Sequence, residues 1–291
     1  MTSPEDPRDG VTATARRYIG GAAILARSLR QPGGRPPEPA AAQVAPPVPA
    51  GWTVAPPDFI GVGTARSGTT WWDSLIHAHP DVARAEGVPK EVHFFDRFWQ
   101  GECSQTEVGA YHAYFARPDG KRAGEWTPGY MLDPWTPPLL RRAAPDARLL
   151  VLLRDPVERF RSGRTLAEGR LTVGASPRAA ANAGFQRGVY ADQLLRLWRA
   201  YPREQVLVLQ FERCVREPLE QLRRTFTFLD LDPEPAGAMD VASVVNESRG
   251  PKVDLTLDQQ TTLVARYGPE NRRLAALLPD DLDLALWAMP R

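Results

Sequence analysis

The chain alternates between short apolar runs and longer stretches whose apolar positions have helical spacing. The apolar runs, which predict buried strands, are 58–63, 147–155 and 205–212. The stretches that predict helices are 69–80, 155–166, 178–201 and 216–231. Strands that are apolar throughout and alternate with helices indicate a parallel sheet covered on both faces. We therefore expect an α/β fold in which helices flank a central parallel β-sheet.

The N-terminal segment has a different composition. Eleven of the 29 prolines precede residue 58, and such a segment does not pack a core. We expect a disordered Pro/Ala-rich arm at 1–51 and a single folded domain at 52–291. An apolar run within 13–34 is shorter than the roughly 20 residues of a membrane-spanning helix and lacks the features of a signal peptide. No transmembrane segment is therefore expected.

Charge and cysteine content narrow the class of protein further. With 24% charged and 43% hydrophobic residues, the composition is typical of a soluble globular protein. The formal net charge of +1 gives no reason to expect a nucleic-acid partner. Cys103 and Cys214 are the two cysteines, too few for a disulfide framework or a metal cluster. A reducing, cytoplasmic location is the default expectation.

The segment FIGVGTARSGTTWW, residues 59–72, joins the first predicted strand to the first predicted helix. Gly63 and Gly68 have the spacing of a nucleotide-binding P-loop, G-x-x-x-x-G-K-[ST], but Thr69 occupies the lysine position. The basic residue lies inside the loop instead, at Arg66. Loop amides and the start of the helix favour an anion, and the hydroxyl donors that add to them are Ser67, Thr69 and Thr70.

A second basic segment begins where the second predicted strand ends, at Arg154. Ligands of parallel sheets bind beyond the carboxyl ends of the strands, so the loop and this segment predict one anion site. One alternative is a P-loop kinase or NTPase in which Asp155 binds magnesium. The missing loop lysine, and Arg154 beside that carboxylate, weaken this alternative.

Two of these segments resemble the sulfotransferases, which use 3′-phosphoadenosine 5′-phosphosulfate (PAPS) as donor. ARSGTTWW (65–72) looks like their 5′-phosphosulfate loop. LLVLLRDPVERFRSGRT (149–165) resembles their 3′-phosphate-binding segment, in which Arg154 and Ser162 would hold that phosphate. An arginine and a hydroxyl supply charged and neutral donors to one phosphate.

Further segments resemble one branch of that family, the heparan sulfate glucosaminyl sulfotransferases. The similar segments are HAHPDVARAEGVPKEVHFFD (77–96), EWTPGYMLDP (125–134) and a stretch at 246–278. The resemblance covers roughly residues 57–287 and points to a soluble, bacterial-type member. Arg249, Gly250 and Lys252 would then belong to a loop that closes over the donor, although Ser248 replaces the lysine expected there.

The same resemblance implies catalytic roles. Glu91 would be the general base that takes the proton of the acceptor, and we expect its apolar neighbours to raise its pKa. His93 and Asp96 would orient the acceptor or tune that base. Arg66 would neutralise charge on the bridging oxygen as the 5′-phosphate leaves; as a guanidinium it stabilises charge without acting as a proton donor.

Two remaining features bear on the acceptor and on metals. Trp126 stands where relatives carry a substrate-facing lysine, so the resemblance implies an acceptor contact for Trp126, with Asp96, and the lost lysine argues against a highly anionic acceptor. Of the tryptophans of this region (71, 72, 99, 126 and 135), most are expected in the core and one is left for the ligand. His77 and His79 are two positions apart on a predicted helix and do not share a face. No cysteine or carboxylate completes a zinc site, so no metal is expected.

The sequence as a whole therefore predicts a PAPS-dependent sulfotransferase with adenosine 3′,5′-bisphosphate as product. The acceptor would be a hydroxyl, or an amine, of a sugar-containing or natural-product molecule. Its identity depends on variable loops, which a shared fold does not specify. Besides the kinase, a second alternative is a nucleotide-binding protein that keeps the fold without catalysis.

Overall fold

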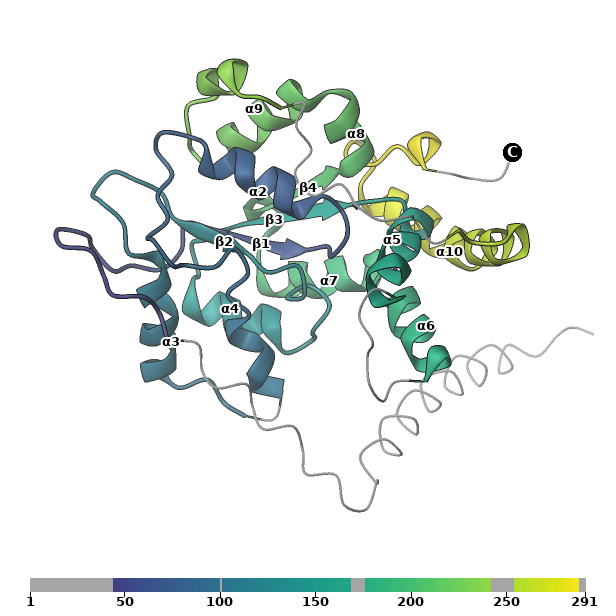
Figure 1. Ribbon diagram of the computed structural model, residues 1–291, viewed down its shortest axis with the longest axis horizontal. Coiled ribbons are helices and arrows are strands. Elements are labelled where there is room, and N and C mark those ends of the chain that lie inside the picture. The colour runs from purple at the N-terminus through teal and green to yellow at the C-terminus, as the bar shows by residue number, and fades with distance from the viewer. Residues whose placement is uncertain (1–43, 100, 169–175, 242–253, 288–291) are drawn as a thin grey trace, which may run out of the picture. The chain divides into compact units, whose positions relative to one another are not determined.

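The computed structural model describes residues 44–99, 101–168, 176–241 and 254–287, all within the compact unit Gln43–Arg291. Its sheet contains β1 (Phe59–Gly63), β2 (Gly124–Trp126), β3 (Arg148–Leu153) and β4 (Val206–Gln210). The strands are parallel and lie in the order β2-β1-β3-β4 (Figure 1). The expected α/β fold with a central parallel sheet is confirmed.

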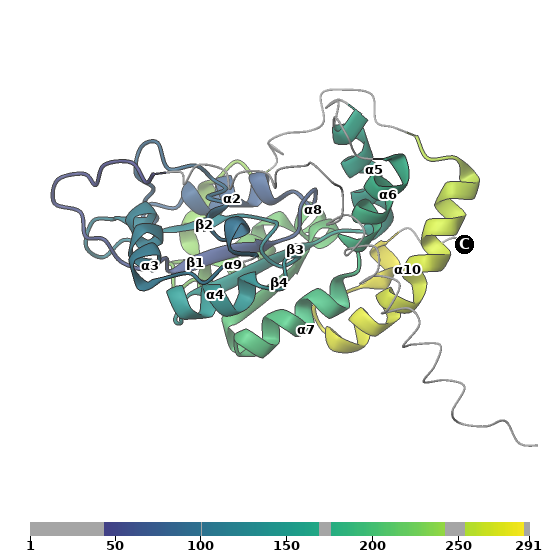
Figure 2. The same cartoon turned by 90° about the horizontal axis from the view of Figure 1, so that it is seen from below.

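Helices cover both faces of this sheet. One layer contains α2 (Thr69–His77), α8 (Phe211–Arg216) and α9 (Pro218–Phe228), and the other contains α3 (Gln105–His112), α4 (Thr136–Ala143) and α7 (Tyr190–Ala200) (Figures 1 and 2). Because successive strand residues face opposite sides, Leu149 and Val151 join one core cluster and Leu150 and Leu152 the other. This two-sided burial is the reason that the strands are apolar throughout.

A third group of helices lies at the carboxyl ends of the strands. It consists of α5 (Pro156–Glu168), α6 (Pro177–Gln186) and α10 (Leu257–Leu277) (Figures 1 and 2). Phe160 and Tyr267 belong to a small core cluster of their own, against which Phe185 packs. This group of helices brings the segment after β3 close to the loop after β1.

Some elements differ from the pattern in the sequence. β2 was not predicted, because its three residues, GEW, include a glycine and a glutamate. The helix predicted over 216–231 is present as α9 but starts at Pro218, since the proline disfavours helical backbone at Glu217, and Arg216 instead ends α8. The helical stretch 178–201 is divided between α6 and α7.

Two other expectations concern the termini and the cysteines. Residues 1–43 of the N-terminal arm lie outside the described residues, and no described helix is long and apolar enough to cross a membrane. Cys103 and Cys214 are buried as free thiols in the two different core clusters.

Candidate active site

The loop between β1 and α2 is held by hydroxyl groups that point inward. The Thr64 hydroxyl donates to the Leu152 carbonyl at 3.0 Å and lies 2.6 Å from the Ser67 hydroxyl oxygen. Ser67 is fully buried and Thr69 nearly so. Thr70, partly exposed, follows in the first turn of α2. These contacts fix the loop against β3, so that its curvature does not depend on a ligand.

Gly68 starts α2 in a conformation that only glycine adopts easily there. Its φ is 83°, and an added Cβ would lie 2.5 Å from the Phe211 ring. No side chain accepts a hydrogen bond as the cap of this helix. The amides of the first turn are donors at the positive end of a nine-residue helix, an arrangement that favours a bound anion.

The basic segment after β3 lies beside this loop, as the sequence predicts. Arg66 has φ 73° and its Nε donates to the Ser162 hydroxyl at 3.1 Å. Arg154 Nη1 donates to the Arg66 carbonyl at 3.2 Å, and its guanidinium lies over the Phe211 ring. The structure thus brings together three side chains that the sequence assigned to the donor: Arg66, Arg154 and Ser162.

Glu91, His93 and Asp96 form a second cluster, as a chain of ion pairs. Glu91 Oε2 lies 3.1 Å from His93 Nε2, and Asp96 Oδ2 lies 2.8 Å from His93 Nδ1. Lys90, which sequence reasoning did not assign, connects the cluster to the loop: its Nζ lies 3.0 Å from Glu91 Oε1 and 3.3 Å from Thr69 Oγ1. The proposed base and the proposed donor loop are therefore adjacent.

Electrostatics in this cluster contradict one expectation. The pKa of Glu91 is lowered, chiefly because Glu91 accepts a hydrogen bond from His93, and Lys90 lowers it further. Partial burial of the carboxylate raises its pKa, but this effect is outweighed by His93 and Lys90, and the apolar Val92 and Phe94 are themselves buried in the core. The hydrogen bonds to Asp96 and then Glu91 raise the pKa of His93 to about 10. Glu91 is consequently an ionised carboxylate at neutral pH, paired with an imidazolium.

A buried carboxylate holds the backbone of this segment. Glu125 in β2 is fully buried, and it accepts hydrogen bonds from Val92 N at 3.0 Å and from the Tyr111 hydroxyl at 2.8 Å. Thr127 joins Glu125 to the cluster of Glu91, His93 and Asp96, since its Oγ1 donates to Glu125 at 2.5 Å and accepts from His93 N. Glu125 was not recognised from the sequence beyond its place in the EWTP segment.

Trp126 does not face the acceptor side of the site. Its exposed fraction is 0%, and its Nε1 donates to the Gly63 carbonyl at 3.1 Å. An added Cβ at Gly61 would lie 2.1 Å from the indole, so this glycine makes room for the ring. Because no surface of Trp126 is left for a ligand, we remove it from the proposed acceptor contacts. Trp71 and Trp72 are also buried, whereas Trp99 is 49% exposed.

The last predictions to compare with the structure are the loop expected to close over the donor and the magnesium ligand of the kinase alternative. Arg249, Gly250 and Lys252 lie outside the described residues. Asp155, the magnesium ligand of the kinase alternative, is only 3% exposed, and its Oδ1 accepts from Val157 N at 2.8 Å at the start of α5. Asp155 therefore serves as a helix cap, as its position before Pro156 suggests.

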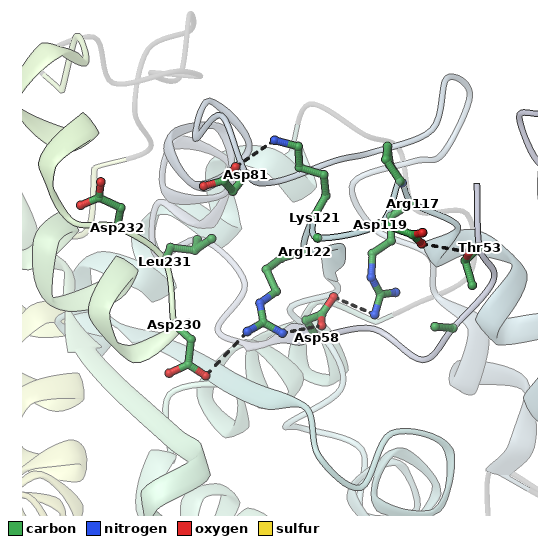
Figure 3. A pocket seen from close by; sticks show the side chains of 13 residues that line it. Thr53, Asp58, Asp81, Arg117, Asp119, Lys121, Arg122, Asp230, Leu231 and Asp232 are labelled. Atoms are coloured by element: carbon green, nitrogen blue, oxygen red, sulfur yellow. Dashed lines mark hydrogen bonds and ion pairs between the residues drawn. The ribbon is translucent and has the colours of Figure 1, made fainter. Parts of the chain in front are cut away.

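A charged cavity of about 500 Å³ lies at the amino ends of the strands (Figure 3). Asp58, which precedes β1, pairs with Arg117 at 3.0 Å and Arg122 at 3.2 Å. Lys121 pairs with Asp81 at 2.8 Å. The three basic side chains that line this cavity are thus each paired with a carboxylate.

The loop after β1, the basic segment after β3 and the paired Glu91 form a candidate anion site at the carboxyl ends of a parallel sheet. Residues 56–249 match the sulfotransferase domain family, and the chain belongs to that family. The kinase alternative is therefore excluded by the family.

Individual relatives agree with this assignment. Human heparan sulfate glucosamine 3-O-sulfotransferase 6 is 31% identical over 182 residues, which are 58% of this chain and 51% of the human protein. Carbohydrate sulfotransferase 15 of Rattus norvegicus is 28% identical over 242 residues, 71% of this chain and 41% of the rat protein. The chain thus spans about half the length, or less, of these curated relatives.

A solved bacterial structure is also similar. The sulfotransferase of Alicyclobacillus acidocaldarius superposes with a TM-score of 0.60 at 25% sequence identity, covering 79% of this chain and 98% of that one. A sulfotransferase domain of the curacin biosynthetic pathway has a TM-score of 0.51 at 13% identity and shares the fold.

Proposed function

We propose that this protein transfers a sulfuryl group from PAPS to a hydroxyl, or to an amine, of a sugar-containing or natural-product acceptor. Glu91 is the general base of this reaction. The single observation that carries the proposal is the position of Glu91: through Lys90 it lies one side chain away from Thr69, at the start of the helix that follows the anion loop.

The described residues fit both phosphate ends of the donor. The buried loop hydroxyls and the uncapped start of α2 suit the 5′-phosphosulfate. Arg154 and Ser162 suit the 3′-phosphate, because a guanidinium and a hydroxyl together bind one phosphate strongly. Arg66 lies between the two groups, since its backbone belongs to the loop and its side chain contacts Ser162.

Transfer requires an acceptor oxygen that loses its proton as it bonds to sulfur. Glu91 takes that proton while the bond between sulfur and the bridging oxygen breaks, and the 5′-phosphate leaves with the bonding electrons. The lowered pKa of Glu91 keeps the base ionised at neutral pH. His93 holds the carboxylate in position, and Asp96 in turn holds His93. The side-chain cations and amides stabilise developing negative charge without a metal.

The acceptor is proposed as a carbohydrate or a molecule with a sugar-like hydroxyl, because the names of the curated relatives refer to carbohydrate acceptors. Because Trp126 is fully buried, it gives no information about the charge of the acceptor.

Donor binding and turnover together test the proposal. Purified protein should be stabilised by adenosine 3′,5′-bisphosphate without metal, by about 2.7 kcal/mol at 100 times the dissociation constant. Magnesium ATP should give no such shift. Transfer of labelled sulfuryl from PAPS to a panel of carbohydrates and phenols then identifies the acceptor class. Stabilisation without turnover on any acceptor would favour the nucleotide-binding protein that lacks catalysis.

A further inference from the structure

Lys90 places an ammonium beside the residue that stands where the ATP-binding P-loop pattern has its lysine. In the ATP-binding pattern the lysine directly follows the second glycine, and here Thr69 follows Gly68. Lys90 Nζ lies 3.3 Å from the Thr69 hydroxyl oxygen, so its ammonium is at the start of α2 although it comes from another segment. Its side chain is only 17% exposed.

Hydrogen bonds to residues of β2 hold the backbone around Lys90. Its carbonyl oxygen accepts a hydrogen bond from Trp126 N at 3.0 Å, and two residues later Val92 N donates to the buried Glu125. The lysine stem therefore leaves a rigid edge of β2 and extends toward the loop. Such support is what a functional cation needs to act in one position.

The loop arginine serves a different part of the site. Arg66 Nε donates to Ser162 at 3.1 Å, on the side of the basic segment after β3. Lys90 is instead paired with Glu91 at 3.0 Å. Arg66 thus extends from the loop toward Ser162, while Lys90, together with His93, is paired with the proposed base.

We propose that Lys90 is the catalytic cation of sulfuryl transfer, contacting the sulfuryl group and the bridging oxygen of the donor. This inference rests on the proposed function. As the acceptor oxygen bonds to sulfur, its proton passes to Glu91, the bond from sulfur to the bridging oxygen breaks, and negative charge grows on the departing phosphate. Lys90, with three N–H donors, stabilises that charge while it keeps a contact with Glu91. Arg66 then has a binding role more than the charge-neutralising role that the sequence suggests.

The contact with Glu91 gives Lys90 a second, measurable effect. Lys90 lowers the pKa of Glu91, after the larger effect of the hydrogen bond from His93. A neutral residue at 90 removes that contribution and raises the pKa of the base. The acid limb of the pH profile of kcat/KM then moves to higher pH, a change that a purely structural role would not produce.

The test compares Lys90→Met with Lys121→Met. Lys121 is a matched control because its ammonium also pairs with one carboxylate, Asp81, but in the cavity at the other end of the sheet (Figure 3). We expect Lys90→Met to lower kcat by about 100-fold and to shift the acid limb upward. Adenosine 3′,5′-bisphosphate keeps the bridging oxygen but lacks the sulfuryl group, so its binding by calorimetry should weaken less than kcat falls, by about 10-fold. Lys121→Met should change none of these.

Lys90→Arg provides a second variant that keeps the positive charge if the methionine variant folds poorly. It should recover part of the lost kcat, because charge is retained with altered geometry. Unchanged kcat in Lys90→Met, or a loss of bisphosphate affinity as large as the loss of kcat, would overturn the role of Lys90 while the wild type still transfers sulfuryl groups. A wild type that neither binds the bisphosphate nor transfers would overturn the proposed function itself.

Discussion

Both ends of the sheet carry arginines and a lysine, but these side chains have different partners at the two ends. At the amino ends of the strands, Arg117 and Arg122 share Asp58, and Lys121 pairs with Asp81 (Figure 3). At the carboxyl ends, Lys90 is likewise paired with a carboxylate, Glu91, whereas Arg66 donates to the Ser162 hydroxyl and Arg154 to the Arg66 carbonyl.

The difference shows that charge content alone does not identify a site. The basic side chains of the amino-end cavity are paired with carboxylates, so a substitution there should have small, local effects. The carboxyl end places a helix start without a side-chain cap beside three cations. A ligand, more than a neighbouring side chain, completes such an arrangement. The variants below test whether function follows this division.

Replacing the proposed base should have the largest effect. Glu91→Gln keeps the shape of the side chain but removes its ability to take a proton, so kcat should fall by about 1,000-fold. Affinity for adenosine 3′,5′-bisphosphate should stay within about threefold. Steady-state transfer assays with PAPS and calorimetry check the two values.

The control for this variant is Asp230→Asn in the amino-end cavity. Asp230 pairs with Arg148 at 2.6 Å and has a φ of 54°, which asparagine tolerates. Its kcat should equal that of the wild type. If Glu91→Gln keeps full turnover, Glu91 is not the base.

Removing the proposed 3′-phosphate contact should affect binding next. Arg154→Ala should weaken adenosine 3′,5′-bisphosphate by about 10- to 100-fold, the range for a hydrogen bond to a charged group. Adenosine 5′-phosphate, which lacks the 3′ group, should lose much less. Competition calorimetry with both nucleotides measures the difference.

Arg122→Ala in the amino-end cavity is the matched control, and it should bind both nucleotides as the wild type does. Equal losses for the two nucleotides in Arg154→Ala would mean that Arg154 contacts something other than the 3′-phosphate.

The sequence predicts those elements of the fold that depend on residues close together in the chain, and misses contacts between distant segments. The strand that precedes Gly63 and the helix capped by Asp155 depend on nearby residues, so periodicity and motif spacing place them correctly. Lys90 and Glu125 act across the fold, on Thr69 and on Val92 respectively. No spacing in the sequence reveals such contacts.

The pKa of Glu91 also differs from the sequence expectation. Apolar neighbours in the sequence suggest a desolvated carboxylate, but alternate residues of that segment face the core and leave Glu91 beside His93 and Lys90. The expected direction was wrong because the charged neighbours in the sequence, His93 and Lys90, contact the carboxylate and outweigh the effect of its burial on the pKa.

Glu125 should matter more for stability than for chemistry. Glu125→Ala leaves the buried Val92 amide and Tyr111 hydroxyl without their acceptor, which should lower the free energy of unfolding by about 2 to 4 kcal/mol. Urea denaturation followed by fluorescence gives the value. Glu86→Ala, at an exposed position, should change it by less than about 0.5 kcal/mol. An equally small change in Glu125→Ala would show that this carboxylate does not support the segment.

The smallest effect concerns the charge on His93. Because its pKa is raised to about 10 by Asp96 and then Glu91, its ion pairs stabilise the fold fully below the unfolded pKa of about 6.5. That contribution is lost as the pH rises through about 10, so the Tm difference between wild type and His93→Gln should shrink over this interval. The difference should be small throughout, because the imidazole is 47% exposed and exposed pairs contribute little. Calorimetric scans at pH 6, 8 and 10 measure it, and an NMR titration of His93 with a midpoint near 6.5 would show that the imidazole is not held between two carboxylates.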